Sequence, residues 1–191
     1  QNQWTIDGLD GTGNYRMRIC SYGAMIARRK GSDILYAAIF RPADEALRGN
    51  GFFYAERGGG AWQWCGECKG FHQLKTVPRE AKRLVVMLEG SSKKFFVPPI
   101  SKLGAIVTNR PSFSSAIAIT TILQDDDNEA TVLVTVENKP WDTWPCLLFV
   151  QEAGGIVSDW RGNPVTPENC GSIIAAANVQ DHAYILGLLE S

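Results

Sequence analysis

The sequence lacks a long hydrophobic run: no stretch of about eighteen consecutive apolar residues occurs among its 191 residues. That absence excludes a membrane-spanning helix of ordinary length. The first residues also lack the charged and then apolar pattern of a secretory signal. We therefore expect a protein that does not act in a membrane.

An excess of charge of one sign is missing as well. The formal net charge is −1, from 19 Lys and Arg against 20 Asp and Glu. Proteins that bind DNA or RNA polymers usually carry a strong basic excess, so this balance argues against a dedicated nucleic-acid binder. A small anionic ligand stays open, because bound metal ions reverse the local sign of the charge.

Cysteine is sparse and shows no pairing pattern. The five cysteines are odd in number and irregularly spaced, which argues against a disulfide framework and favours a reducing, cytoplasmic setting. Cys65 and Cys68 form one C-x-x-C pair with His72 nearby, but no second pair follows. A structural zinc site needs four ligands, so a pair of loop thiols is preferred here over a zinc knuckle.

The segment Trp4–Asn14 is the most informative part of the chain. In it Asp7 and Asp10 stand three positions apart and are followed at once by Gly11-Thr12-Gly13. We interpret the apolar lead-in Trp4–Ile6 as the end of a buried strand. Carboxylate oxygens are ligands that Mg²⁺ prefers, and glycines let backbone N–H groups approach an anion closely. The alternative is a plain turn, which Asp and Gly also favour.

A third carboxylate, Asp142, lies far along the chain between Trp141 and Thr143. We predict a helix from Asp142 to Ala153, ended by Gly154-Gly155, with Pro145 in its first turn. At the start of this helix Asp142 is expected to act as an N-cap. A capping carboxylate can also bind a metal ion through its other oxygen, so both roles are open.

Short strands dominate the first part of the sequence, which predicts an antiparallel meander with little helix. Lys30–Asp33 is a hairpin-like turn, Arg41–Asp44 breaks a strand, and Gly58–Gly60 turns into another strand. The predicted strands lie within residues 15–30, which begin with the alternation Arg16 to Ile19, at Ile34–Phe40, at Gly51–Glu56 and after Gly60.

After Pro78 the pattern becomes α/β. We expect an antiparallel α+β part at residues 1–78 with the first motif and an α/β part at residues 79–191 with the Trp141-Asp142 pair. Gln124–Glu129 is an acidic turn. The other predicted strands and helices are Leu84–Leu88, Ile106-Val107, a helix within Ser112–Leu123, Ala130–Val136, Ile156–Asp159, Ile173–Ala177 and a last helix after Asn178.

The segment Trp4–Asn14 and the later segment from Trp141 to Gly155 together resemble motifs of the inositol monophosphatase family. Its first motif, Asp-Pro-aliphatic-Asp-Gly-Thr, is matched by Asp7, Leu9, Asp10, Gly11 and Thr12. Its second motif, Trp-Asp followed by a helix and Glu-Ala-Gly-Gly, is matched by Trp141, Asp142 and Glu152–Gly155, and a glycine-rich family turn by Gly58–Ala61. The resemblance implies an α+β fold, a layered α-β-α-β-α sandwich of the sugar phosphatase type.

The same resemblance implies a Mg²⁺-dependent hydrolase of a small phosphate monoester, such as inositol monophosphate or a related sugar or polyol phosphate. Asp10 and Thr12 would be catalytic, and the Thr12 hydroxyl would orient the attacking water. Metal-activated water would attack directly, without a phosphoenzyme. Dimers are common in the family, so a homodimer is a further implication. The metal ligands would be Asp7, Leu9 through its carbonyl, Asp10 and Asp142, and the phosphate would contact Leu9, Asp10, Gly11, Thr12 and Asp142.

Several positions depart from the family pattern. Gly8 replaces the usual Pro, which loosens the loop. A Glu that precedes the Trp-Asp pair in inositol-binding members aligns with Thr135, and Glu137 can substitute from the same face of a strand. The choice between inositol, other sugar, histidinol and nucleotide phosphates is therefore open. Ser114-Ser115-Ala116 resembles a family segment that contacts substrate, whereas His72 and His182 match no family site.

The family normally has a segment before the first motif that supplies a Glu metal ligand, an Asp that works with the motif threonine, and helices. This chain begins at Gln1 rather than Met, and the first motif follows almost at once. We therefore expect a fragment. The alternative to an enzyme is a catalytically impaired or non-catalytic protein of the family fold that serves as a binding or assembly module.

Overall fold

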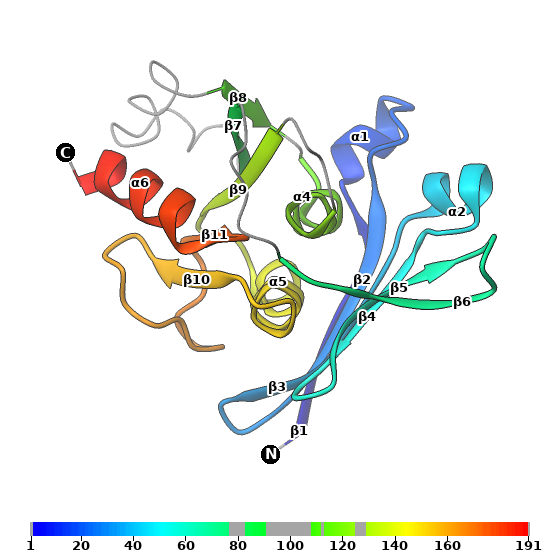
Figure 1. Cartoon of the computed structure of the whole chain (residues 1–191), viewed down its shortest axis with the longest axis horizontal. Helices are drawn as coiled ribbons and strands as arrows, with labels where there is room; N and C mark the ends of the chain where they lie inside the picture. The colour runs from blue at the N-terminus through cyan, green and yellow to red at the C-terminus, as the bar shows by residue number, and fades with distance from the viewer. Residues whose placement is uncertain (1, 77–82, 91–107, 112, 125–128, 191) are drawn as a thin grey trace.

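The structure, a computed structural model, describes residues 2–76, 83–90, 108–111, 113–124 and 129–190 (Figure 1). Its first part is a six-stranded antiparallel sheet, here called sheet A, whose strands follow one another in chain order. This is the predicted meander. Its strands are β1 (Asn2–Asp10), β2 (Gly23–Lys30), β3 (Asp33–Phe40), β4 (Phe52–Glu56), β5 (Gly60–Cys65) and β6 (Gly70–Leu74).

The second part is a five-stranded mixed sheet, here called sheet B, with the order β10-β11-β9-β7-β8. Strand β7 pairs in parallel with β8 and β9, whereas β11 pairs antiparallel with β9 and β10. Parallel pairing places the carboxyl ends of β7, β8 and β9 at one edge. The strands are β7 (Arg83–Gly90), β8 (Thr108–Pro111), β9 (Glu129–Val136), β10 (Ile156–Asp159) and β11 (Ile173–Ala176).

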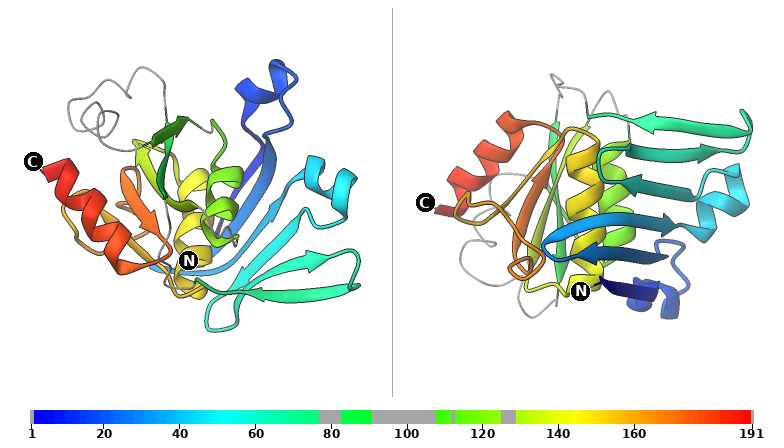
Figure 2. Two further views of the ribbon diagram at one scale, coloured as in Figure 1. Left: turned by 45° about the horizontal axis from the view of Figure 1, so that its top comes forward. Right: turned by 90° about the horizontal axis from the view of Figure 1, so that it is seen from below.

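Two helices lie between the sheets, and a third covers the other face of sheet B (Figures 1 and 2). The inner helices are α4 (Ser115–Leu123) and α5 (Pro140–Glu152), and the outer helix is α6 (Val179–Glu190). Helices packed between and beside two sheets give an α+β layered fold, so the fold class predicted from the sequence is confirmed. None of the described helices is long and apolar enough to cross a membrane.

Helix α5 is the centre of this packing. All eight residues from Thr143 to Val150 are buried, because the helix contacts sheet A on one side and α4 and sheet B on the other. A helix enclosed in this way is apolar all round rather than on one stripe. Phe149 and Leu148 are 0% and 1% exposed, and burying one such side chain contributes about 1.5–3 kcal/mol. The position of α5 is therefore strongly determined.

The outer face of sheet A carries exposed aromatic side chains. Tyr54 packs edge to face on Phe71, and Arg28 lies over the rings of Trp4 and Tyr36. Trp4 and Ile6 are 57% and 68% exposed. The prediction that Trp4–Ile6 ends a buried strand was wrong, because β1 is an edge strand on which Trp4 and Ile6 face away from the helices.

Two short helices interrupt the first part where strands or turns were predicted. Arg16 belongs to α1 (Thr12–Arg16), and the following residues up to Tyr22 form a loop, so the strand predicted from the alternation of Arg16 to Ile19 was wrong. Arg41–Asp44 is not a simple break, since α2 (Pro42–Arg48) begins there with Pro42 in its first turn. Strand β6 was not predicted.

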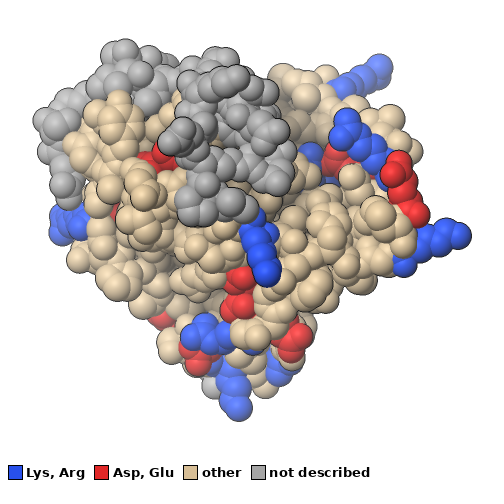
Figure 3. Space-filling view, viewed as in Figure 1, with Lys and Arg blue, Asp and Glu red and all other residues tan. Residues whose placement is uncertain are grey.

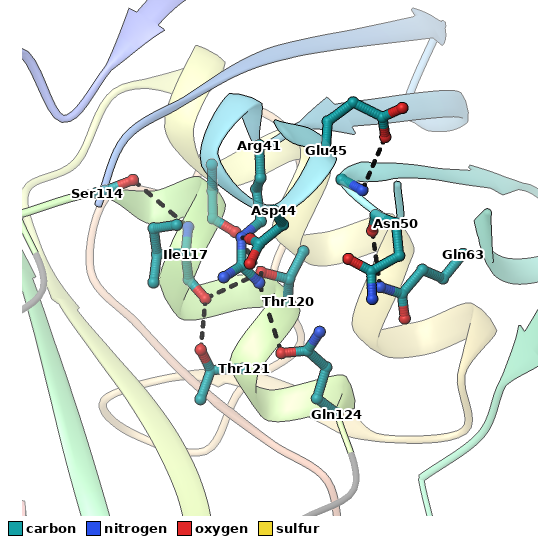
Figure 4. A network of polar contacts seen from close by, with 12 residues as sticks. Arg41, Asp44, Glu45, Asn50, Gln63, Ser114, Ile117, Thr120, Thr121 and Gln124 are labelled. Carbon is teal, nitrogen blue, oxygen red and sulfur yellow. Dashed lines mark hydrogen bonds and ion pairs between the residues drawn. The ribbon is translucent and has the colours of Figure 1, made fainter. Parts of the chain in front are cut away.

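Arg41 joins α2 to α4 (Figure 4). Its guanidinium donates a hydrogen bond of 3.0 Å from Nη1 to Thr120 Oγ1 and forms an ion pair with Asp44. It also lies over the ring of Phe53. Burial lowers the pKa of Arg41, but the neighbouring carboxylate of Asp44 opposes that shift. This contact holds the end of sheet A beyond β3 against the helix layer.

Three sequence predictions fall partly or wholly outside the described residues. They are the strand at Ile106-Val107, most of the acidic turn Gln124–Glu129, and the boundary between residues 78 and 79. The division of the chain at that boundary stays a prediction. Strand β8 follows the first of these segments at Thr108.

Glu152, at the end of α5, holds a turn of sheet A. Its two carboxylate oxygens accept hydrogen bonds from the backbone N–H groups of Gly58 at 2.8 Å and Gly60 at 3.0 Å. Two sequence motifs that the family resemblance identified separately, the glycine-rich turn and the Glu-Ala-Gly-Gly segment, therefore contact one another. Their role is to fasten the β4–β5 turn to the helix layer.

Replacing Glu152 tests this role. We expect Glu152→Ala to lower the free energy of unfolding by about 2–3 kcal/mol, because two N–H groups lose a charged acceptor. Glu152→Gln should cost less, since the amide oxygen can still accept one bond. Urea unfolding measures both. Glu56→Ala, an exposed residue of the same hairpin, is the control with an expected change within about 0.5 kcal/mol. Equal effects of Glu152→Ala and Glu56→Ala would contradict the assignment.

Candidate metal and phosphate site

The end of β1 is distorted at the first acidic motif. Asp7 pairs with Met25 and Asp10 with Gly23, so β1 has one residue more than β2 between these two pairs. The Asp7 carboxylate accepts a hydrogen bond of 2.9 Å from the backbone N–H of Leu9, which fixes the bulge from within. A β-bulge re-aims side chains at the end of a strand.

Asp10 is 6% exposed and anchored to the start of α4. Its Oδ2 atom accepts hydrogen bonds from the Ser114 hydroxyl at 2.6 Å and from the backbone N–H of Ala116 at 2.8 Å. Ser114 is the N-cap of α4, and its hydroxyl oxygen also accepts the N–H of Ile117. A carboxylate at a helix N-terminus is stabilised by N–H groups that lack partners within the helix and by the helix dipole.

Asp142 lies in the first turn of α5, although not at the position predicted. The helix begins at Pro140 with Lys139 as N-cap, and Asp142 is the third helical residue. One of its carboxylate oxygens, Oδ2, accepts a hydrogen bond of 3.2 Å from the N–H of Lys139. The N-cap prediction was therefore wrong, because the helix starts two residues earlier. For the same reason Pro145 lies inside the helix rather than in its first turn.

The three carboxylates converge. One oxygen each of Asp7, Asp10 and Asp142 lies within 4.8 Å of the other two. Two full charges at that separation repel by about 3 kcal/mol at an effective dielectric constant of about 20. Within the described part of the chain, no Lys or Arg forms an ion pair with any of them. Such a cluster favours either a bound cation or proton uptake.

The pKa values of Asp142 and Asp10 are both raised in this cluster. Burial, helped by the negative charges of Asp10 and Asp7 and opposed by the hydrogen bond from Lys139, raises the pKa of Asp142 to about 6. Burial likewise raises the pKa of Asp10, while hydrogen bonds from Ser114 and Ala116 oppose the shift. The residues that hold Asp10 thus favour its charged form, which is the form that binds a cation.

The turn after Asp10 approaches α4 closely. Gly11 has a φ of +79°, and a Cβ atom there would lie 3.0 Å from the Cβ of Ser114 and 3.0 Å from the carbonyl oxygen of Ser21. Only glycine satisfies both conditions without strain. Thr12 and Gly13 are exposed at the start of α1, and the Thr12 hydroxyl donates a hydrogen bond of 2.8 Å to the Leu9 carbonyl.

Other residues singled out in the sequence lie elsewhere. Thr135 is 2% exposed, and its hydroxyl donates to the carbonyl oxygen of Gly171 and accepts the N–H of Ile173. The exposed Glu137 and Lys139 instead line an open cleft of about 570 Å³. The buried His182 shares a hydrogen bond of 2.8 Å with Ser158, and His72 one of 3.2 Å with Gln63.

Sequence reasoning missed how Asp10 is held. Ser114-Ser115-Ala116 resembles a family segment that contacts substrate, a role that stays a prediction, and in the structure Ser114 and Ala116 contact Asp10. The available signal was a serine directly before an apolar helical stretch, which is an N-cap pattern. That pattern does not say which distant carboxylate the helix start will meet.

Comparison with protein families identifies the family to which the chain belongs. The inositol monophosphatase family model matches residues 1–191. This chain belongs to the inositol monophosphatase family.

Curated relatives agree with this membership. The chain is 28% identical over 188 residues to an inositol-1-monophosphatase of Mesorhizobium japonicum, covering 97% of this chain and 66% of the relative. It is 27% identical over 166 residues to the Nus factor SuhB of Salmonella typhimurium, covering 84% and 57%. The chain thus spans two thirds or less of the length of these relatives.

Solved structures of the inositol monophosphatase family share the fold. An IMPase of Thermotoga maritima superposes with a TM-score of 0.76 at 21% identity, over 99% of this chain and 68% of that one. An IMPase/NADP phosphatase complexed with Mg²⁺ and phosphate superposes with a TM-score of 0.77 at 15% identity, over 100% and 67%. At these identities the likeness establishes the layered architecture.

The crowding of carboxylates predicts a pH dependence of stability in metal-free protein. Folding raises the pKa of Asp142 from 3.8 to about 6. Its contribution to stability is therefore complete below pH 3.8 and is lost as the pH rises through about 6. We expect the free energy of unfolding to fall by on the order of 1–2 kcal/mol from this group, after allowance for solvent screening.

Urea unfolding in EDTA at a series of pH values measures this fall. The Asp142→Asn variant has no group to titrate at that position, so its stability should decline less over the same range. An equal decline in both proteins would show that Asp142 does not carry the effect.

Proposed function

We propose that this chain carries the site of a Mg²⁺-dependent hydrolase acting on a small phosphate monoester. The observation that supports the proposal most is the convergence of Asp7, Asp10 and Asp142 beside the exposed residues Thr12 and Gly13, without an ion-pair partner among the described residues. Family membership makes a phosphatase the expected reaction class.

The donor set fits Mg²⁺. Three carboxylates supply the hard oxygen ligands that this ion selects, and the Leu9 carbonyl, two peptide bonds from Asp7, would add a fourth. Bound divalent cations neutralise phosphoryl oxygens and make a water molecule a better nucleophile at neutral pH. One structural neighbour, an IMPase/NADP phosphatase, is complexed with Mg²⁺ and phosphate, which is in keeping with both ligands.

Thr12 would orient the water. Its hydroxyl proton is donated to the Leu9 carbonyl at 2.8 Å, which leaves the hydroxyl oxygen as an acceptor for a proton of water. The backbone N–H groups of Gly11 and Thr12, at the start of α1, would bind the phosphate oxygens. Asp10 would then contact both the cation and the phosphate. Proximity of these groups, rather than a side-chain nucleophile, would lower the barrier.

The rest of the substrate would face the open cleft beside Lys139. Lys139 lines this cleft, and its backbone N–H donates a hydrogen bond to Asp142, so one residue of the cleft wall contacts the carboxylate cluster. Its lining includes side chains of both signs, among them Glu137 and Arg161, and such a lining suits a polyol or sugar rather than an apolar alcohol. Because the Thr135 side chain is buried and bonded to the Gly171 and Ile173 backbone, a substrate contact from this part of the chain would come from Glu137, which directly follows β9.

Loss of the Asp142 carboxylate or of the Thr12 hydroxyl should abolish or reduce turnover. We expect Asp142→Asn to lower Mg²⁺-dependent phosphate release from inositol monophosphate and sugar phosphates at least about a hundredfold. Thr12→Ala should lower kcat about a hundredfold, and Thr12→Ser should restore part of this loss. Asp33→Asn, an exposed acid paired with Arg57, is the control. Unchanged kcat in Asp142→Asn would contradict the proposal.

Ser114 should act through Asp10. Removing its hydroxyl leaves Asp10 with one fewer hydrogen bond, so Ser114→Ala should weaken Mg²⁺ binding about tenfold or more, as measured by calorimetry. Thr121→Ala, on the same helix, removes a hydroxyl that donates to the Ile117 carbonyl and, among the described residues, forms no hydrogen bond with Asp10, so it serves as control. Equal Mg²⁺ affinity in the two variants would argue against the positioning role of Ser114.

A second candidate is a binding role without turnover. Its support is the relative named as a Nus factor in Salmonella typhimurium, together with the exposed aromatic face of sheet A. On the face shown in Figure 3, acidic and basic side chains are interspersed, so no patch of one sign dominates it. Bound Mg²⁺ without phosphate release from any monoester would favour this candidate. A homodimer and a cytoplasmic location stay predictions.

A further inference from the structure

The turn between β5 and β6 brings two cysteines together. Cys65 is the last residue of β5, and Cys68 lies in the turn 66–69 that leads to Gly70 of β6. Cys68 is exposed and Cys65 partly so, whereas Cys146 and Cys170 are buried. The remaining cysteine, Cys20, is exposed and stands outside this turn. The pair plays no part in the proposed phosphatase site.

In the contact between the two cysteines, Cys68 is the hydrogen-bond donor and Cys65 is the acceptor. The backbone N–H of Cys68 donates a hydrogen bond of 3.1 Å to the sulfur of Cys65. Hydrogen bonds from the Cys68 thiol and then from its backbone lower the pKa of Cys65, and the same contact raises the pKa of Cys68. Cys65 is thus the better thiolate and Cys68 the proton donor, which is the division of labour between an attacking and a resolving thiol.

The turn is held in place by its neighbours. Cys65 pairs with Gly70 in the strand register, which closes the hairpin. Gly66 lies against the end of α2, where a Cβ atom would come within 2.7 Å of the Gly49 carbonyl oxygen. The backbone nitrogen of Cys68 lies 3.1 Å from the sulfur of Cys65, so the two residues already touch, as a disulfide between them requires. The backbone therefore needs little movement for the two sulfurs to join.

A metal site explains the pair less well. Within the described residues, the only group of three or more acidic, Cys or His side chains close enough to hold an ion is the Asp7, Asp10 and Asp142 cluster. His72 is hydrogen-bonded to Gln63 at 3.2 Å. A structural zinc ion needs four ligands, whereas a disulfide needs only the two thiols that are present.

We propose that Cys65 and Cys68 form a thiol–disulfide exchange site that closes to an intramolecular disulfide when it meets a low-molecular-weight disulfide. The Cys65 thiolate attacks one sulfur of the small disulfide, forms a mixed disulfide and releases one thiolate. Cys68 then loses its proton and attacks the Cys65 sulfur, which releases the second thiolate. Two protein thiols are oxidised and one small disulfide is reduced to two thiols.

The test is to incubate the full chain with oxidised glutathione and measure its intact mass and peptide map. We expect the peptide that contains Cys65 and Cys68 to lose two hydrogen atoms and both free thiols, with reversal by dithiothreitol. Cys20, which has no such neighbour, should instead carry a glutathione unit. Cys68→Ser should trap glutathione on Cys65, because the resolving thiol is missing.

Two controls separate this outcome from general oxidation. Cys20→Ser should leave closure of the pair unchanged, and iodoacetamide at limiting amount should label Cys65 before Cys68. Glutathione on both Cys65 and Cys68 of the unaltered chain, or no reaction at the pair when Cys20 reacts, would overturn the proposal. These readouts do not use phosphatase activity, so their result is independent of it.

Discussion

The hydrogen bonds from Ser114 and Ala116 to Asp10 are the interaction on which the site depends. They bring the end of sheet A to the start of α4, and they oppose the effect of burial on the pKa of this carboxyl group. Without them a carboxylate that is 6% exposed and close to two others would be strongly favoured to take up a proton. The same contact requires Gly11, because a side chain there would collide with Ser114.

The second constraint is the position of α5. Its buried middle fixes the helix between the two sheets, its first turn presents Asp142, and its last residue holds the β4–β5 turn through Glu152. One rigid element therefore sets both the third carboxylate and the packing of sheet A. The second family motif spans this helix, and its two ends have different physical tasks: Asp142 belongs to the carboxylate cluster, and Glu152 holds the β4–β5 turn.

Much of the architecture could be predicted from the sequence, because alternation and apolar runs report burial directly. Strands β3, β4, β7 and β9 to β11 and helix α6 follow from such patterns. Trp4–Ile6 could not be placed correctly, since strand order decides which face is covered. The five-residue helix α1 has too short a pattern to detect. The carboxylates were found from local motifs, but their anchor was not, because Ser114 and Asp10 are 104 positions apart.

Anomalous diffraction from crystals soaked in Mn²⁺, a divalent ion with the same preference for oxygen ligands, would show whether the three carboxylates hold one cation. We expect a peak within coordination distance of Asp7, Asp10 and Asp142 together. A peak elsewhere, or three carboxylates that stay apart with no ion among them, would contradict it.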